Sequence, residues 1–185
     1  MFCGASRGRS RILYPHGVKR RLAFPDLCGY HVILSQRRRH PYYHSKVYHE
    51  LKRRFPDLKL FIVGANPPTR IRALADDPSI IVTGFVADVR PYFARASVFI
   101  APFVSGQGIK TKVIEAMAMG KPVVSTSLGA QGINAIGGDH LYIADSPTAF
   151  ANRVTELLLD DVKRKTVGCR ARVCRKEAFL GARER

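Results

Sequence analysis

The sequence lacks several features that would place it in a specialised class of protein. It has no tryptophan, and four cysteines among its 185 residues. It contains no run of about 18 apolar residues, which excludes a membrane-spanning helix of ordinary length. The cysteines form no Cys-x-x-Cys pair and match no zinc-site spacing; they are Cys3, Cys28, Cys169 and Cys174. We therefore expect no bound metal, and reduced thiols in a cytoplasmic protein.

Acidic residues are also scarce, at 14 Asp and Glu against 31 Lys and Arg, for a net charge of +17. The excess lies in the flanks, because residues 1–54 hold 13 basic and 2 acidic side chains and residues 163–185 hold 9 and 2. Residues 55–162 are close to neutral, with 9 and 10. This distribution argues against a specific nucleic-acid interface, which places its basic residues on a folded face. Non-specific, salt-sensitive binding of polyanions by the flanks stays an alternative.

The first part of the chain shows neither helical nor strand periodicity. It begins with basic residues but has no apolar core of about 7–15 residues, so we do not expect a secretory signal. His40 and His44 could bind a metal, but no third ligand is spaced to help them. We predict an irregular basic segment over residues 1–45, with one short strand at His31–Ser35.

From residue 46 onward, short apolar runs alternate with amphipathic stretches. The alternation predicts an α/β fold, a Rossmann-like doubly wound parallel sheet in a single domain over residues 46–162. A basic helix or tail follows over residues 163–185. The expected strands are 58–63, 80–83, 97–101, 122–125 and 141–144, and the main helices are 45–55, 89–95, 109–119 and 148–159. Ligands of such sheets bind at the carboxyl ends of the strands.

One loop at that edge contains a Gly-x-Gly sequence, Gly106-Gln107-Gly108, directly before the helix expected from residue 109. The free N–H groups and the positive dipole end of a helix attract anions. Lys110 and Lys112 lie in the first turn, where cations oppose the dipole, so a polyanion such as a diphosphate would explain them. The alternative is that both lysines are simply solvated.

Glu115 follows in the same helix, between apolar neighbours. A carboxylate can accept two hydrogen bonds from adjacent hydroxyl groups, which suits the 2′- and 3′-hydroxyls of a ribose. The alternative is an ion pair with Lys112, three residues before it, worth a few tenths of a kcal/mol. Spacing alone leaves both interpretations open.

Four segments together resemble a known family. They are RRFPDLKLFIVGANP, IIVTGFVADVRPYFARASVFIAPF, GQGIKTKVIEAMAMGKPVVSTSLGAQGI and LYIADSPTAFANRVTELLLD. The stretch over residues 47–165 resembles the C-terminal, nucleotide-sugar-binding domain of two-domain glycosyltransferases of the family 4 type. It is most similar to bacterial sugar transferases of the exopolysaccharide or cell-envelope type. The resemblance implies transfer of a sugar from a nucleoside-diphosphate carrier to an acceptor.

The resemblance also implies roles for individual residues. Glu115 corresponds to the glutamate that holds the ribose, and the loop with Phe85 and Val86 to the one that contacts the base. The diphosphate and sugar would lie at Gly106, Gln107, Gly108, Lys110 and Lys112, and Gly129-Ala130-Gln131-Gly132 matches a loop near the donor. Many retaining relatives carry glutamate where this chain has Gln107. No catalytic residue is assigned, and no cofactor beyond the donor substrate is expected.

The same resemblance implies an N-terminal acceptor domain, which nothing in these 185 residues matches. Residues 1–45 match neither that domain nor the opening strand of the donor domain. We therefore expect a truncated product with little or no turnover by itself. A split transferase completed by a partner chain, and a non-catalytic module that binds a nucleotide or a partner, remain alternatives. Peripheral contact with a membrane is also left open.

Overall fold

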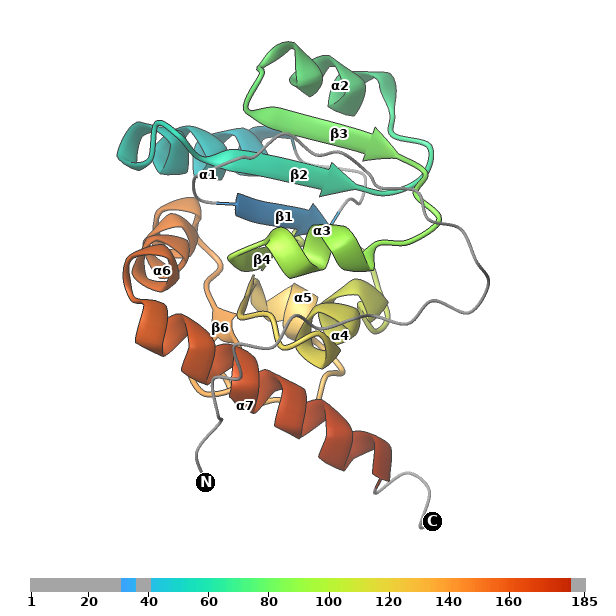
Figure 1. Cartoon of the computed structure of the whole chain (residues 1–185), viewed down its shortest axis with the longest axis vertical. Coiled ribbons are helices and arrows are strands. Elements are labelled where there is room, and N and C mark those ends of the chain that lie inside the picture. The colour runs from blue at the N-terminus through green and yellow to red at the C-terminus, as the bar shows by residue number, and fades with distance from the viewer. Residues whose placement is uncertain (1–30, 36–40, 181–185) are drawn as a thin grey trace.

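The computed structural model describes residues 31–35 and 41–180 and contains one parallel sheet of six strands (Figure 1). The strand order is β3-β2-β1-β4-β5-β6, and each neighbouring pair runs parallel. The strands are β1 (His31–Ser35), β2 (Lys59–Val63), β3 (Ile80–Gly84), β4 (Val98–Ala101), β5 (Val123–Ser125) and β6 (Tyr142–Ile143). This confirms the predicted parallel sheet and its five predicted strands between residues 58 and 144.

Helices cover both faces of the sheet, which makes the fold doubly wound. One face packs against α1 and α6, and the other packs against α3 and α4, with α7 lying outside α4. The helical segments are α1 (Pro41–Arg54), α2 (Thr69–Arg72), the short 3₁₀ helix η1 (Ala73–Asp76), α3 (Arg90–Arg95), α4 (Thr111–Ala118), α5 (Ser127–Ala130), α6 (Pro147–Leu159) and α7 (Asp161–Leu180). The predicted α/β Rossmann-like class is therefore confirmed.

The continuous apolar runs of the central strands serve two cores at once. In β2, Leu60 and Ile62 point into the core under α1 and α6, whereas Phe61 points into the core under α3 and α4. In β4, Val98 and Ile100 alternate with Phe99 in the same way. Successive strand residues face opposite sides of a sheet, so a strand covered on both faces has no polar position.

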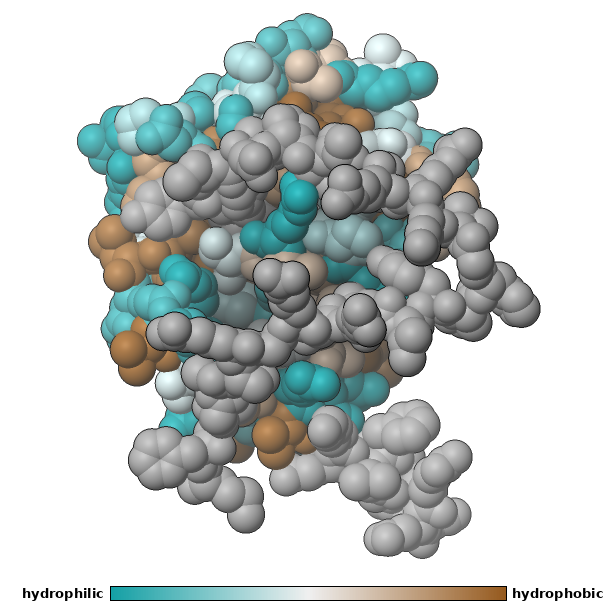
Figure 2. Space-filling view, viewed as in Figure 1, coloured by the Kyte–Doolittle hydropathy of each residue, from teal (hydrophilic) through white to brown (hydrophobic). Residues whose placement is uncertain are grey.

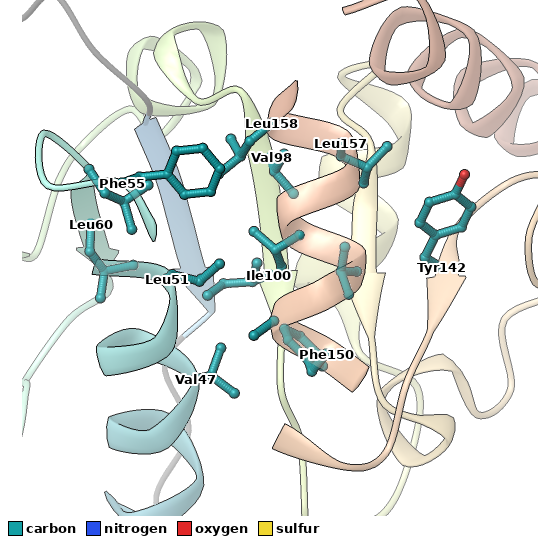
Figure 3. Close-up of a cluster of buried hydrophobic side chains, with 14 of the residues drawn as sticks. Val47, Leu51, Phe55, Leu60, Val98, Ile100, Tyr142, Phe150, Leu157 and Leu158 are labelled. Carbon is teal, nitrogen blue, oxygen red and sulfur yellow. The ribbon is translucent and has the colours of Figure 1, made fainter. Parts of the chain in front are cut away.

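The first core joins segments that lie about 100 residues apart in the sequence. Val47 and Leu51 of α1 point toward β4 and toward α6, and α6 contributes Phe150 and Leu157 (Figure 3). All four side chains are at most 2% exposed. Burial of each large apolar side chain contributes about 1.5–3 kcal/mol, so this contact is a main source of the fold's stability.

The prediction of an irregular segment through residue 45 is wrong at its end. The short strand expected at His31–Ser35 is present, and it lies in the middle of the sheet between β2 and β4. The helix α1 begins at Pro41, four residues before the expected boundary. The chain therefore does contain an opening strand for this domain. Residues 1–30 and 36–40, with His40, lie outside the described residues.

The C-terminal basic segment is a helix, as predicted, but it does not begin a separate unit. The helix α7 starts at Asp161 and lies along α4, and it contributes Val167, Ala171 and Cys174 to the buried cores. Its Gly168 lies against the carbonyl of Gly120, two residues after the end of α4. None of the helices within the described residues combines the length and the apolar character that a membrane span needs.

A polar cluster fixes α1 to the start of β3. The Tyr48 hydroxyl donates to Asp77 Oδ2 at 2.6 Å, and the backbone N–H and the hydroxyl of Ser79 both donate to Asp77 Oδ1. The Ser79 hydroxyl, followed by the Tyr48 hydroxyl, lowers the pKa of Asp77 to about 2. On the sides of α1 and α2 that face solvent, the residues are mostly hydrophilic (Figure 2).

We expect Gly168→Ala to destabilise the protein. A methyl group at Gly168 would lie 2.3 Å from the carbonyl oxygen of Gly120, so α7 must shift away from α4. Overpacking of this kind costs about 1–3 kcal/mol and outweighs the better helix propensity of alanine, about 1 kcal/mol. Urea denaturation measures the free energy of unfolding. The control is Thr166→Ala on the exposed side of α7, and equal stability of the two variants would contradict the close contact.

The Asp77 cluster predicts a local pH dependence. Because the folded state lowers the pKa of Asp77 from 3.8 to about 2, its hydrogen bonds stabilise the fold above its ordinary pKa. That contribution is lost as the pH falls toward 2. In Tyr48→Phe we expect the pKa of Asp77 to rise toward its ordinary value, because one donor to the carboxylate is gone. A carboxyl carbon NMR titration measures this value directly, and an unchanged pKa in the variant would refute the assignment.

Candidate functional site

The strand order places a topological switch point between β1 and β4 at the carboxyl edge of the sheet. The chain winds from β1 to β2 and β3 on one side, and from β4 to β5 and β6 on the other. The winding direction therefore reverses between β1 and β4, and ligands of doubly wound sheets bind in the crevice at such a switch point. The loop after β1 falls on residues 36–40, outside the described part of the chain. The loop after β4, residues 102–110, is described and forms one wall.

That wall contains the Gly-x-Gly sequence. Gly106 and Gly108 have φ angles of +106° and +77°, which L-amino acids with a side chain rarely adopt. A Cβ atom at either position would meet nothing within 4 Å, so the glycines are required by backbone conformation and not by crowding. Gln107 lies between them with an exposed side chain. The predicted loop is thus present, and it faces solvent at the switch point.

Lys110 does not point into the crevice. Its side chain is only 4% exposed, and its ammonium donates to the carbonyl oxygens of Gly106 at 3.2 Å, Gln107 at 3.2 Å and Gly108 at 2.6 Å. The ammonium also lies 5.7 Å from the centre of the Phe103 ring. The assignment of Lys110 as a direct phosphate contact therefore does not match its position, and a solvated lysine does not match it either. Its partners are the backbone of the loop itself.

Lys112 and Glu115 lie on the outer face of α4. Val113, Ala116 and Met117 occupy the inner face and are fully buried. The Lys112 ammonium donates to Glu115 Oε2 at 2.7 Å, and the two side chains are 48% and 41% exposed. The ion pair that spacing allowed is therefore present. Because both groups are exposed, each remains accessible to a ligand.

Phe85 and Val86 follow β3 at the same edge, but β2 and β1 separate β3 from β4. The side chain of Val86 packs against the core under α3 and α4, so a ligand meets chiefly its backbone. The Phe85 ring is 78% exposed. It lines a hollow together with Asn66, Pro67, Pro68, Thr69 and Arg72. The structure thus groups the glycine loop, Lys112 and Glu115, and sets Phe85 and Val86 apart from them.

Sequence reasoning missed three polar residues that hold the loops of this edge together. The hydroxyl of Ser125 donates to Ala101 O at 3.2 Å, and that of Thr126 donates to Phe103 O at 2.5 Å. Both side chains are buried, so they tie the end of β5 to the end of β4. A signal was present in the sequence, because a Ser-Thr pair closes the apolar run that forms β5.

The third missed residue is Asp145, which fixes α5. Its carboxylate accepts the Ser127 backbone N–H at 2.8 Å and the Ser127 hydroxyl at 2.6 Å. These two bonds lower the pKa of Asp145, and the bond from the Ser127 hydroxyl has the larger effect. The segment Gly129-Ala130-Gln131-Gly132 ends α5 next to the glycine loop, since a Cβ at Gly132 would lie 3.0 Å from the Ile109 side chain. Gln131 itself is exposed.

The site offers hydrogen-bond donors, one exposed cation and one exposed carboxylate. Within the described ranges, no group of three or more His, Cys, Asp or Glu side chains lies together in a way that could hold a metal ion. The His44 side chain falls outside what the structure describes. The arrangement can therefore bind an anion at the loop and hydroxyl groups at Glu115, side by side on one helix.

Comparison with known proteins defines the class. The model of the family described as "Glycosyl transferases group 1" matches residues 30–160, more than half of the chain. The match begins one residue before β1, which agrees with β1 as the opening strand. This chain belongs to that family of glycosyl transferases, as its sequence motifs indicated.

Individual relatives share the same region. A Mycobacterium leprae protein named phosphatidyl-myo-inositol mannosyltransferase is 33% identical over 117 residues, 60% of this chain and 31% of that protein. An uncharacterised 44.6 kDa protein of the Klebsiella pneumoniae cps region is 28% identical over 121 residues, 61% of this chain and 31% of that protein. The chain thus spans about a third of the length of these curated relatives.

Solved structures show the same fold. The C-terminal domain of the group 1 glycosyl transferase LpcC from Francisella tularensis superposes with a TM-score of 0.65 at 17% identity, covering 81% of this chain and 86% of that domain. Anabaena HepE in complex with UDP and glucose gives a TM-score of 0.68 at 18% identity, covering 82% of this chain and 45% of that protein. Both likenesses show that the chain has the Rossmann-like fold of these proteins.

We expect the exposed pair on α4 to add little to stability. Glu115→Gln and Lys112→Met should each change the free energy of unfolding by less than about 0.5 kcal/mol, because solvent screens an exposed i,i+3 pair. The matched control is Arg53→Met, which removes the cation of the exposed Arg53–Glu50 pair on α1. Chemical denaturation checks all three variants. A loss of more than about 1.5 kcal/mol at Glu115 would instead mean that the carboxylate is a structural requirement of the fold.

Proposed function

We propose that this chain is the donor-binding half of a glycosyltransferase that moves a sugar from a nucleoside diphosphate to an acceptor. The observation that carries the proposal is the juxtaposition of three features at the switch point. The glycine loop exposes its backbone, Lys112 presents a cation in the first turn of α4, and Glu115 presents a carboxylate beside that cation. A nucleoside diphosphate has the complementary sequence of groups: two phosphates followed by a ribose.

The proposed binding mode exchanges one ion pair for two ligand contacts. Lys112 leaves Glu115 and donates to a phosphate oxygen, while the freed Glu115 carboxylate accepts hydrogen bonds from the ribose hydroxyls. At the start of α4, the N–H groups of Val113 and Ile114 donate to Lys110 O, which leaves those of Thr111 and Lys112 for the ligand. The positive end of the helix dipole favours the phosphates. Breaking the exposed pair costs only a few tenths of a kcal/mol, so the exchange is favourable once charge-assisted bonds to the ligand form.

The base would lie toward β3, along the backbone of Phe85 and Val86. This part of the proposal is supported by the exposure of the Phe85 ring and by the anchoring of Val86 in the core, which fixes the loop. Gln107, in the glycine loop, has an exposed side chain beside the proposed phosphate position and offers the donor a neutral amide. The donor is the only small molecule that the proposal requires.

The names of the relatives indicate a class of acceptor. Those names refer to a cps region, to phosphatidyl-myo-inositol and, for a Bacillus subtilis protein 39% identical over 80 residues, to teichuronic acid biosynthesis. We therefore include a cell-envelope or exopolysaccharide acceptor in the proposal. The proposal also includes an acceptor domain, which lies on the same gene product or on a partner chain. It places the protein in the cytoplasm.

Calorimetric titration tests the proposal with UDP, GDP and ADP and with their nucleosides. At the nucleotide that binds most tightly, Glu115→Gln should weaken the nucleoside and the diphosphate alike, by about 1–2 kcal/mol. Lys112→Met should weaken only the diphosphate, by a similar amount. Its nucleoside affinity should stay the same or rise slightly, because Glu115 no longer has to leave an ion pair.

The control for charge is again Arg53→Met, which should bind every probe as the unaltered protein does. Two results would contradict the proposal. One is that none of the three diphosphates binds to the unaltered chain. The other is that Glu115→Gln binds nucleoside and diphosphate with unchanged affinity while the fold stays intact, which would make Glu115 an ion-pair partner of Lys112 and nothing more.

A further inference from the structure

Lys110 is the most deeply buried charged side chain among the described residues, and its hydrogen bonds are fully used. An ammonium group carries three N–H donors and no acceptor. Three carbonyl oxygens, those of Gly106, Gln107 and Gly108, lie within 3.2 Å of its nitrogen. With the side chain 4% exposed, the ammonium has no donor left for a ligand and no open path to one.

The three carbonyls determine where the N–H groups of the loop point. In a trans peptide the C=O of one residue and the N–H of the next point in opposite directions. Carbonyls that converge on the buried ammonium therefore turn the N–H groups of Gln107, Gly108 and Ile109 outward. These N–H groups have no hydrogen-bond partner within the described part of the chain. Consecutive N–H groups around residues of positive φ form a concavity that binds anions.

Such a loop does not hold this conformation by itself. Glycine loses more conformational freedom than any other residue when it is ordered, and residues 106–108 are exposed, so side-chain packing does little to fix them. The ammonium of Lys110 replaces the missing packing, because one buried group binds three consecutive peptide units. The Phe103 ring, 5.7 Å away and itself buried, covers the ammonium from the core side.

We infer that Lys110 is a positioning residue: it braces the Gly106–Gly108 loop so that the loop N–H groups face the phosphates of the donor, and it does not contact the donor. The inference rests on the proposed function for the identity of the anion. It assigns different roles to the two lysines of one turn. Lys112 would bind the phosphate directly, whereas Lys110 would act only through the backbone. A preordered loop binds more tightly because less entropy is lost on binding.

The experiment compares Lys110→Met with Lys112→Met in the full 185-residue chain. Backbone ¹⁵N relaxation gives the order parameters of Gln107 and Gly108 without added nucleotide. Calorimetry gives the affinity for UDP, GDP and ADP and for their nucleosides. We expect Lys110→Met to lower the order parameters from about 0.85 toward 0.6 and to weaken the diphosphate at least about tenfold, with the nucleoside unchanged. Lys112→Met should weaken the diphosphate while the order parameters stay unchanged.

Two results would overturn the inference that Lys110 positions the loop. If Lys110→Met loosens the loop and the diphosphate binds as before, the loop conformation does not matter for binding. If the diphosphate weakens while the order parameters stay high, Lys110 is a direct ligand. If Lys110→Met does not fold, Lys110→Arg replaces it, since its planar fork places the donors differently. In Lys110→Arg, the order parameters of the loop and the affinity for the diphosphate must either both change or both stay as they are. A change in only one of these two quantities overturns the inference.

Failure of the proposed function gives a different result. In that case the unaltered chain binds none of the three diphosphates, whatever the loop does. The order parameters of Gln107 and Gly108 then test the role of Lys110 by themselves. If they fall in Lys110→Met, Lys110 orders the loop. If they do not fall, Lys110 does not have that role either.

Discussion

The structure depends on the central pair of parallel strands, β1 and β4. The two neighbours of β1, β2 and β4, come from different halves of the chain. The winding direction therefore reverses at β1, and such a reversal opens a crevice at the carboxyl edge of the sheet. The central strands are apolar because both faces of the sheet are covered, and polar groups collect where the strands end. Ser125 and Thr126 show this, because they follow directly on the apolar part of β5 and tie its end to the loop after β4.

Fold and site share one further constraint, the burial of a charge. A lysine taken out of water must find hydrogen-bond acceptors, and Lys110 finds them in the backbone of the loop it follows. The cost of burying the ammonium is offset by three carbonyl contacts that also order the loop. The exposed pair of Lys112 and Glu115 is the opposite case: it adds little to stability, and that is why both groups can be used for binding.

Much of the fold and the place of the site could be predicted from the sequence. Apolar runs that end at glycine predicted β2 and β3, the amphipathic spacing of Val47 and Leu51 predicted α1, and Gly-x-Gly before a helix predicted the loop. The start of the domain could not be predicted as well. The strand at His31–Ser35 was expected, but its central place in the sheet was not, because that place is decided by pairing with β2 and β4.

The sequence by itself determined the family, the order of strands and helices, and the two lysines and the glutamate on one helix, because periodicity and motif spacing are local properties. Only the tertiary structure decided that Lys110 turns inward while Lys112 turns outward, and that α7 is held to α4 through Gly168. It also decided that two strands, β2 and β1, separate the strand before Phe85 from the strand before the glycine loop. The physical reason is that burial, the direction of a side chain and close backbone contacts depend on how the segments pack in space, as Phe103 packs against Lys110 and Gly120 against Gly168.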